Sequence, residues 1–223
     1  MTSKKKTVYF TDNTSADYDA LITTIPLDQL IAKSNLTSVK KLKEEFKHSS
    51  VHVVGAGILG QKPSHLKTKC WTYFPEDNCP FYRATVFSNY SKNNVANPEK
   101  HWSLMTETSQ SNYKPVDYKK IATQSVQGLK NTKFIGKTDK IVDRFHHFEE
   151  YAYPTPFLKR DQIIKNVLPA YQKHDIYSRG RFGAWKYEVG NMDHSLMQGV
   201  EIANYLVKKE KETTLFHPET VNK

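Results

Sequence analysis

The chain of 223 residues carries a formal net charge of +10, and 38% of its residues are hydrophobic. This length is enough for one large core or two small ones, and the composition is typical of a soluble globular protein. No apolar run approaches the roughly 20 residues of a membrane-spanning helix, and the N-terminus MTSKKKTVYF lacks the apolar stretch of a secretory signal. We therefore expect a cytoplasmic protein that does not associate with membranes.

The positive charge is dispersed along the chain. Lysines cluster mildly at 4–6, 39–47 and 208–211, where they mix with acids or lie at chain ends. Nucleic-acid binding usually needs a concentrated basic patch, so we expect no nucleic-acid partner, although a locally positive cleft would suit a diphosphate. The residues around Cys70 and Cys79 do not show the spacing of Cys and His ligands that is typical of metal sites. We therefore expect two reduced thiols and no metal site.

The first predicted elements are short. Strand-like runs at 7–11 and 18–24 flank a turn at Asp12-Asn13, and a break at Pro26 precedes a short helix over 27–32. An amphipathic helix is then predicted over 38–46.

From residue 50 onward the pattern changes to β structure. Runs of β-branched and aromatic residues between turn residues predict an antiparallel sheet with strands at 51–58, 70–74, 83–88, 102–108 and 141–148. Two helices are expected among them: 117–129, with Ile121, Ser125 and Val126 facing inward, and 161–171, interrupted near Pro169.

The run VHVVGAGILG at 51–60 matches the dinucleotide-binding pattern GxGxxG. A Rossmann turn needs a helix that begins at the second glycine, and Pro63 would break such a helix after a single turn. An alternating strand and helix pattern does not follow either. We therefore predict that Gly55, Gly57 and Gly60 belong to the sheet and contact no cofactor.

The stretch YSRGRFGAWKYEVGNMDHSLMQGVE at 177–201 combines permissive backbone with charge and aromatic surface. Gly180 and Gly183 allow the main chain to approach another group closely. The cationic and stacking side chains of this stretch are Arg181, Trp185, Lys186 and Tyr187. Together these features predict the wall of a ligand site.

A helix is predicted directly after this wall. Gly190-Asn191 gives a sharp turn, and Asn191 or Asp193 can cap the helix. Apolar residues then recur at helical spacing: Leu196, Met197, Val200, Ala203, Leu206 and Val207. The N–H groups at the start of such a helix favour a phosphate or an electron-rich ring, unless the turn merely leads into a core helix.

Three segments carry a resemblance to a known family. The stretch at 177–201, CWTYFPEDNCPFYRATVFSNYS at 70–91 and YAYPTPFL at 151–158 resemble, in the same order, segments of eukaryotic-type UDP-galactopyranose mutases. The similarity runs through nearly the whole chain. It corresponds to the C-terminal half of the family, without the GxGxxG turn that holds the adenosine diphosphate of FAD.

The resemblance and the predicted elements imply an α+β fold. We expect a remnant of the FAD-binding domain with linking helices over 1–48, and an antiparallel β-sheet domain with flanking helices over 49–175. A C-terminal strand, turn and helix over 176–210 would contact the flavin and belong to an incomplete, Rossmann-like FAD-binding domain. Residues 211–223 would form a tail.

The resemblance also implies substrate contacts. Arg83 matches the arginine that grips the diphosphate of the UDP-sugar, a role for which a guanidinium is suited because it donates two hydrogen bonds at once. Trp71 and Tyr73 alternate along the neighbouring segment, so they should share one face with it. Tyr153 and Tyr187 match tyrosines that reach the same diphosphate.

The flavin contacts follow in the same way. Arg181 matches an arginine between flavin and sugar, and with Arg83 it is the expected catalytic residue. The family's contacts to FAD match the backbone of Gly190, Asn191 and Met192 and the hydroxyl of Ser195. Met192 departs from the glutamine usual in the family, but a backbone N–H serves whatever the side chain is, so we expect the site to persist.

The implied activity interconverts UDP-galactopyranose and UDP-galactofuranose without net redox change. In the family, reduced FAD attacks the anomeric carbon through N5, UDP leaves, and the sugar ring opens and recloses, after NADPH or NADH has reduced the flavin. We expect the chain to act in this way as part of a longer protein, which could be a homo-oligomer, and to be inactive alone.

Two other interpretations stay open. A flavin-dependent oxidoreductase of the amine-oxidase-like superfamily would share the terminal turn and helix, but it would not need Arg83 beside several tyrosines. A non-catalytic remnant that binds sugar nucleotides would keep the sheet domain without flavin. Paired serine, histidine and aspartate at recognisable spacing are missing, so a hydrolase triad is not supported.

Overall fold

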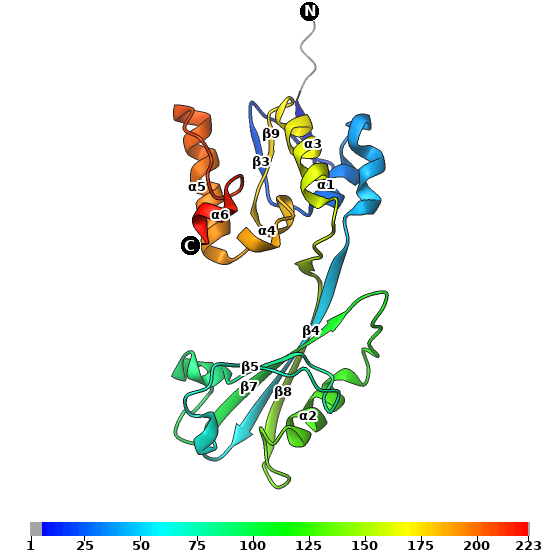
Figure 1. Cartoon of the computed structure of the whole chain (residues 1–223). Helices are drawn as coiled ribbons and strands as arrows, with labels where there is room; N and C mark the ends of the chain where they lie inside the picture. Colours follow the sequence, from blue (N-terminus) through cyan, green and yellow to red (C-terminus); the bar gives the residue numbers. More distant parts are fainter. Residues whose placement is uncertain (1–5, 223) are drawn as a thin grey trace, which may run out of the picture. The chain divides into compact units, whose positions relative to one another are not determined.

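The chain divides into two compact units, which are described separately. The computed structural model describes residues 6–222, so Lys4 and Lys5 of the first lysine cluster lie outside the described residues. The first unit comprises Met1–His48 and Tyr153–Lys223, and the second comprises Ser49–Ala152 (Figure 1). The second unit is therefore an insertion between two parts of the first. Residues 153–175, which the sequence analysis assigns to the sheet domain, belong to the first unit because the helix they form packs on the strand that follows it.

The first unit combines short strands with helices. Its strands are β1 Thr7–Tyr9, β2 Ser15–Asp17, β3 Leu21–Thr23 and β9 Ile176–Ser178. Its helices are α1 Leu27–Lys33, α3 Arg160–Gln172, α4 Gly180–Gly183, α5 Met192–Lys208 and α6 Pro218–Val221. Two 3₁₀ segments complete it, Thr37–Glu45 and Tyr187–Val189. The helix predicted over 27–32 and the helix predicted after Gly190-Asn191 are confirmed.

A parallel strand pair joins the two ends of the first unit. β3 pairs with β9 from Leu21↔Ile176 to Thr23↔Ser178, and α3 packs against β9 (Figure 1). Beyond this pair, the Arg179 N–H donates to the Thr23 carbonyl at 2.9 Å. The glycine-rich turn that follows β9 is thereby anchored to a strand about 150 residues earlier, which no local pattern reveals.

Trp185 lies in the core of the first unit. Its side chain is fully buried, with ring centroids 5.1 Å from Phe46 and 5.5 Å from Phe182. The backbone adopts φ 55° at this residue, where the chain turns at the end of α4. The prediction that Trp185 forms part of a ligand wall is wrong. Removing the large indole from water stabilises the fold, so the side chain packs in the core.

Two helix predictions need correction. α3 continues through Pro169 to Gln172, since a proline so near the C-terminal end disturbs few intrahelical hydrogen bonds. The amphipathic helix predicted over 38–46 is instead a 3₁₀ run over Thr37–Glu45 in which Val39 is the buried residue. With so little apolar surface to bury, the full α-helical register has little advantage there.

The second unit is built on a five-stranded sheet. Its order is β5-β6-β7-β4-β8, with β4 His48–Leu59, β5 Trp71–Tyr73, β6 Arg83–Thr85, β7 His101–Gln110 and β8 Ile141–Pro154. The pairs β5–β6, β6–β7 and β4–β7 are antiparallel, which confirms the predicted sheet. Short 3₁₀ turns lie at Ser64–Leu66, Phe87–Asn89 and Lys92–Asn94.

One face of this sheet packs on α2, Ile121–Asn131 (Figure 1). The core between them contains Ala56, Ile58, Trp102, Leu104, Val126 and Leu129. The predicted inward residues of the helix, Ile121, Ser125 and Val126, are all buried. Alternation along the strands then leaves the opposite face, with Gly55 and Met105 in register, free of this helix.

The GxGxxG match lies in the sheet. Gly55 and Gly57 are in β4, which runs on to Leu59, and Gly60 follows at φ 108° in the turn. The prediction that this run is not the start of a Rossmann helix is confirmed. A Cβ at position 55 would lie 3.3 Å from Cβ of Phe145, so the glycine there allows close packing of side chains from the next strand.

The apolar side of α5 is exposed in this chain. Leu196 is 72% exposed and Val207 82%, while Gln198 and Ile202 supply the buried side of the helix. Ile22 of β3 is also exposed. An open parallel strand pair beside an exposed apolar helix face is typical of elements that continue into a larger layered structure.

Within residues 6–222, none of the helices combines the length and apolar character needed for a membrane span. Three or more His, Cys, Asp or Glu side chains do not gather as a metal site within that same range. Cys70 and Cys79 are both unpaired, as expected.

Two histidines form a hydrogen-bonded pair in the second unit. His52 is buried, and its Nε2 lies 2.7 Å from Gln110 Oε1 while its Nδ1 lies 3.0 Å from His146 Nε2. The amide oxygen accepts from Nε2, and in the neutral tautomer that this contact selects, Nδ1 accepts from His146. The rings of Tyr118 and Phe148 enclose the pair, with centroid distances of 4.6 Å from Tyr118 to His146 and 4.9 Å from Phe148 to His52.

We expect this pair to make the second unit less stable in acid. Burial lowers the pKa of His146, and the nearby His52 and His147 lower it further. Unfolded chain takes up this proton near the ordinary value of about 6.5, whereas folded chain takes it up only at lower pH, so stability falls as the pH drops below about 6.5. Urea unfolding at pH 7.5 and 5.5 should show this loss. His146→Gln should reduce it and the exposed His217→Gln should not; equal pH dependence in both variants would contradict the assignment.

Candidate functional site

The predicted substrate residues of the second unit meet on one face of the sheet. The register pairs Tyr73 with Arg83 across β5 and β6, and Arg83 with Glu107 across β6 and β7. Trp71 lies two residues from Tyr73 and therefore on the same face. We call Trp71, Tyr73, Tyr82, Arg83 and Glu107 the arginine cluster.

Arg83 is held from several sides. Its Nη2 lies 2.5 Å from Glu107 Oε2, and Nη1 donates to the Tyr73 hydroxyl at 3.4 Å. The guanidinium carbon lies 5.6, 5.9 and 5.8 Å from the ring centroids of Trp71, Tyr73 and Tyr82. Such cation–π contacts orient a guanidinium without neutralising it. Trp71 and Tyr73 are 58% and 59% exposed, so the cluster presents two aromatic rings beside a fixed cation.

Glu107 is a residue of this cluster that the sequence analysis missed. It is buried, and its Oε2 accepts hydrogen bonds from the Tyr82 hydroxyl at 2.7 Å and from Arg83. A buried carboxylate is costly unless it is paired, so Glu107 holds the Arg83 guanidinium in this orientation. The sequence does offer one signal, since Glu107 is the only acid in the run 101–110. Its partner Arg83 is identified only by the register of β6 and β7.

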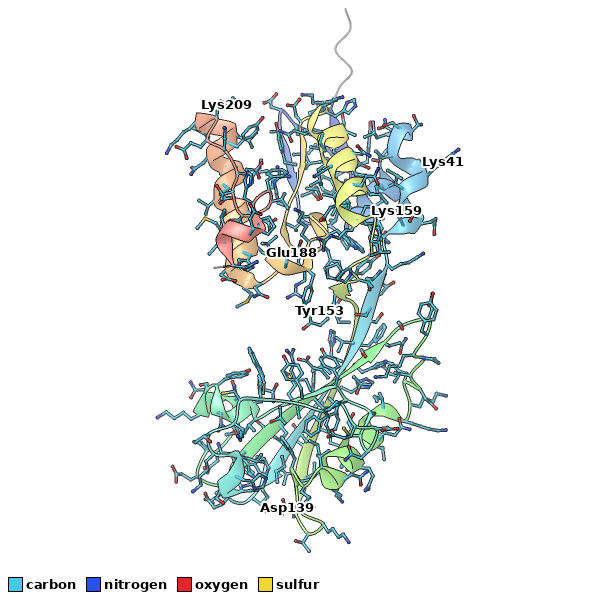
Figure 2. The ribbon with its side chains drawn as sticks, in the orientation of Figure 1. Lys41, Asp139, Tyr153, Lys159, Glu188 and Lys209 are labelled. Atoms are coloured by element: carbon cyan, nitrogen blue, oxygen red, sulfur yellow. The ribbon has the colours of Figure 1, made fainter. Side chains whose placement is uncertain are left out.

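The predicted residues of the first unit gather around the turn after β9. Arg181, in α4, donates from Nε to the Gly190 carbonyl at 2.9 Å. Its guanidinium carbon lies 4.9 Å from the ring centroid of Tyr153, and the rings of Tyr153 and Tyr187 are 5.8 Å apart. Figure 2 labels Tyr153 at the end of β8. We call Tyr153, Arg181, Tyr187 and Gly190 the turn cluster.

The start of α5 adjoins the turn cluster. Asn191 occupies the N-cap position, but within the described part of the chain its side chain makes no capping hydrogen bond, contrary to prediction. The first bond of the helix runs from the Ser195 N–H to the Asn191 carbonyl at 2.9 Å. Earlier N–H groups of a helix have no intrahelical acceptor, so those of Met192 and its neighbours are donors for another group.

Gln198 is the second residue that the sequence analysis missed. Its side chain is fully buried, accepts from the Gly180 N–H at 2.8 Å and donates to the Val189 carbonyl at 2.8 Å. It therefore ties α5 to both ends of the glycine-rich turn. Gly183 adds a close approach here, because a Cβ at that position would lie 3.3 Å from the Thr23 carbonyl oxygen. Lys186, predicted as ligand surface, instead donates to the Leu215 carbonyl at 3.1 Å.

The chain is similar to several proteins of known structure. No protein-family model matches the chain. A crystal structure of reduced UDP-galactopyranose mutase is 44% identical with a TM-score of 0.93, and the match covers 98% of this chain and 47% of that protein. A fatty acid isomerase from P. acnes is 12% identical with a TM-score of 0.58, covering 88% of this chain and 43% of that protein. A proposed protoporphyrinogen oxidase from Exiguobacterium sp. 255-15 is 15% identical with a TM-score of 0.52, covering 74% and 37%.

The two distant structures show the fold alone. They share with this chain an α+β fold that combines an antiparallel sheet unit with a unit of parallel strands and helices. The close match goes further. The chain belongs to the UDP-galactopyranose mutase family, as its sequence resemblance predicted, and it spans about half the length of the family member it matches.

Proposed function

We propose that this chain forms part of a mutase that interconverts UDP-galactopyranose and UDP-galactofuranose with reduced FAD. The observation that carries the proposal is the arginine cluster, in a chain 44% identical to a UDP-galactopyranose mutase. The matched protein was crystallised in its reduced form. The reaction would make the enzyme a flavin-dependent isomerase.

Arg83 is proposed to bind the diphosphate of the UDP-sugar. Its guanidinium carries five N–H donors in a fixed, planar fork that suits a diphosphate, and it remains charged throughout the reaction. A fixed cation stabilises the negative charge that develops as UDP leaves the anomeric carbon, because little reorganisation is needed at that moment. Tyr73 and Trp71 would order the substrate beside Arg83.

Tyr153 and Tyr187 are proposed to donate their hydroxyls to the diphosphate of the UDP-sugar. Tyr187 is exposed, and Tyr153 is placed by its contact with Arg181. Their proposed role is positioning, which holds UDP during the interval in which the sugar is detached from it.

The turn cluster and the start of α5 fit the redox-active end of FAD. A Cβ at Gly190 would lie 3.2 Å from Cγ of Arg181, so the glycine lets the main chain run close to that side chain. The residues proposed to hold the flavin are Arg181, Gly190, Asn191, Met192 and Ser195. When bound and reduced by NADPH or NADH, FAD supplies the nucleophile for the anomeric carbon. Arg181 would orient the sugar against it.

The test compares the 223-residue chain with a chimera that adds the segment of the matched mutase outside the alignment. We expect the chain alone to purify without stoichiometric flavin, because the residues assigned above would hold only one end of FAD. The chimera should be yellow and should convert UDP-galactofuranose to UDP-galactopyranose only under dithionite. Flavin absorbance and chromatographic separation of the two sugars measure these outcomes.

Other outcomes would identify the competing functions. A yellow chimera that stays inactive under dithionite would favour an oxidoreductase of the same fold. A folded chimera that binds UDP without flavin would favour a non-catalytic sugar-nucleotide-binding protein. Either result would overturn the proposed mutase activity.

A further inference from the structure

A polar cavity lies in the sheet unit, where β4 ends and β7 begins. Its volume is about 330 Å³, and three lysines line it: Lys62, Lys67 and Lys92. It lies at the opposite end of β7 from the arginine cluster, since His101 in its lining precedes Glu107 by six residues, roughly 20 Å of strand. The proposed mutase chemistry does not use this cavity.

The lining of the cavity carries positive charge only. Among the described residues, its lining contains no aspartate or glutamate, and the remaining residues are neutral or histidine. Lysines that line one cavity without a neighbouring acid make its potential positive, which favours a bound anion. The cavity therefore differs from the dispersed lysines elsewhere, many of which lie beside acids.

Asn89 organises two of the lysines. Its Nδ2 donates to the carbonyls of Leu66, Lys67 and Lys69 at 3.1, 3.2 and 2.6 Å, and its Oδ1 accepts from Nζ of Lys62. One side chain thus closes the loop that carries Lys67 and orients Lys62 toward the same place. Such preorganisation reduces the entropy that ligand binding would otherwise cost.

The inner wall supplies a further donor. Ser88 Oγ accepts from the Ser103 N–H at 3.2 Å, which leaves its O–H to donate. His101 and the buried Trp102 also line the cavity, so their rings can report on a bound ligand. A hydroxyl donor beside the lysines suits a ligand that presents several acceptor oxygens.

We propose that this cavity binds the phosphoryl group of a small phosphorylated molecule. A phosphate dianion offers several strong acceptor oxygens, which match three lysine ammonium groups and the Ser88 hydroxyl. A carboxylate has one charge and fewer acceptors, so it would leave part of this set unsatisfied. The volume accommodates the phosphoryl group together with a small organic moiety.

The test is titration of the 223-residue chain with inorganic phosphate and with glucose 6-phosphate, at constant ionic strength in chloride. Ring signals of His101 and Trp102 in NMR spectra should shift saturably with one site. Lys67→Gln/Lys92→Gln should weaken binding about tenfold or more, since two charge-assisted contacts are lost. Lys62 is left intact because its contact with Asn89 shapes the loop.

The control variant Lys119→Gln/Lys137→Gln removes the same charge from exposed positions of the same unit. It should change the affinity by less than about twofold, since surface charges at a distance are screened. Tighter binding of glucose 6-phosphate than of phosphate would identify an ester as the ligand, and the reverse would identify free phosphate. Equal weakening in both double variants, non-saturable shifts, or tighter binding of a short single-stranded DNA would overturn the proposal.

Discussion

Replacing Glu212 by alanine is expected to destabilise the first unit by about 3–5 kcal/mol, the usual cost of leaving one partner of a buried ion pair. The side chains of Arg179 and Glu212 are 3% and 4% exposed. Arg179 donates from Nε to Oε2 at 2.5 Å and from Nη2 to Oε1 at 2.6 Å. Alanine would leave the guanidinium buried without its counter-ion, which is more costly than losing an exposed pair.

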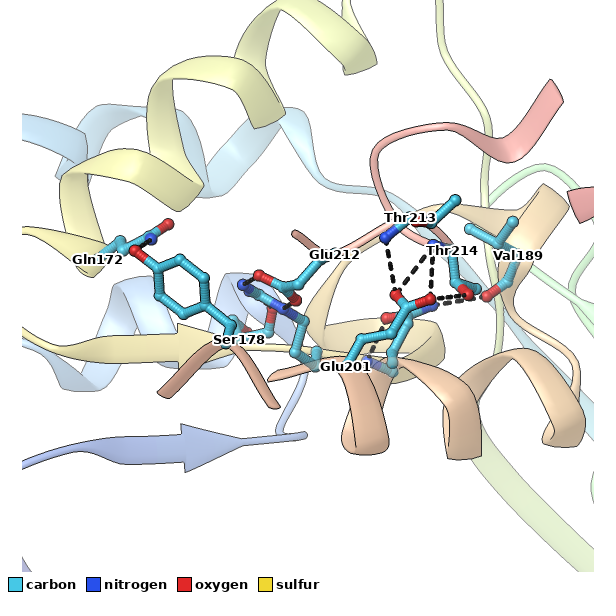
Figure 3. Close-up of polar contacts among 11 residues, drawn as sticks. Gln172, Ser178, Val189, Glu201, Glu212, Thr213 and Thr214 are labelled. Atoms are coloured by element: carbon cyan, nitrogen blue, oxygen red, sulfur yellow. Dashed lines mark hydrogen bonds and ion pairs between the residues drawn. The ribbon is translucent and has the colours of Figure 1, made fainter. Parts of the chain in front are cut away.

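The pair matters because it fastens the C-terminal segment to β9. Residues 212–215 of the expected tail include the buried Glu212, Thr214 and Leu215. Glu201 of α5 accepts from the Thr213 and Thr214 N–H groups at 3.0 and 2.9 Å (Figure 3). Loss of the ion pair should therefore loosen this segment as well as the strand that leads into the glycine-rich turn.

Urea unfolding followed by the indole NMR signal of Trp185 measures this effect, since that indole is buried in the first unit. Glu210→Ala serves as the matched control, because Glu210 is half exposed and pairs with Lys208 only at 3.8 Å. The double variant Arg179→Met/Glu212→Leu should recover most of the lost stability, since apolar residues of similar size often replace a buried pair without loss. A Glu212→Ala protein as stable as the control would show that the pair contributes little.

Replacing Arg83 by alanine is expected to weaken UDP binding by about 1.5–3 kcal/mol, or about 10-fold to 150-fold. This prediction rests on the proposed function and uses the chimera described above. The reason is loss of a charge-assisted contact to the diphosphate. Flavin content should change little, since the flavin contacts are assigned to Arg181 and the start of α5. Titration with UDP measures the affinity.

Glu107→Gln tests how the arginine is held. The amide keeps the size and one acceptor but removes the charge, so Arg83 should lose its fixed orientation, and UDP affinity should fall by less than in Arg83→Ala. Arg144→Ala, a change at an exposed arginine of the same unit, is the matched control and should leave UDP affinity unchanged. Unchanged UDP affinity in Arg83→Ala would show that Arg83 does not bind the diphosphate and serves only to pair with Glu107.

Local patterns in the sequence determined most of the elements. Alternation of β-branched and aromatic residues located the strands of the sheet, and the position of Pro63 excluded a Rossmann helix after Gly57. Helical spacing and the turn at Gly190-Asn191 located α5. The same alternation set Trp71 and Tyr73 on one face, beside Arg83. Each of these features depends on residues that are close to one another in the sequence.

Only the tertiary structure decided which residues became partners across long separations. The pairing of β3 with β9, the contact of Glu107 with Arg83 and the ion pair of Arg179 with Glu212 join segments that are 24 to more than 150 residues apart. The tertiary structure also decided the roles of Trp185 and Lys186, which the sequence predicts as ligand surface. Trp185 is buried in the core, and Lys186 donates to the Leu215 carbonyl. Burial and charge pairing are properties of the folded neighbourhood, and neither propensity nor spacing encodes them.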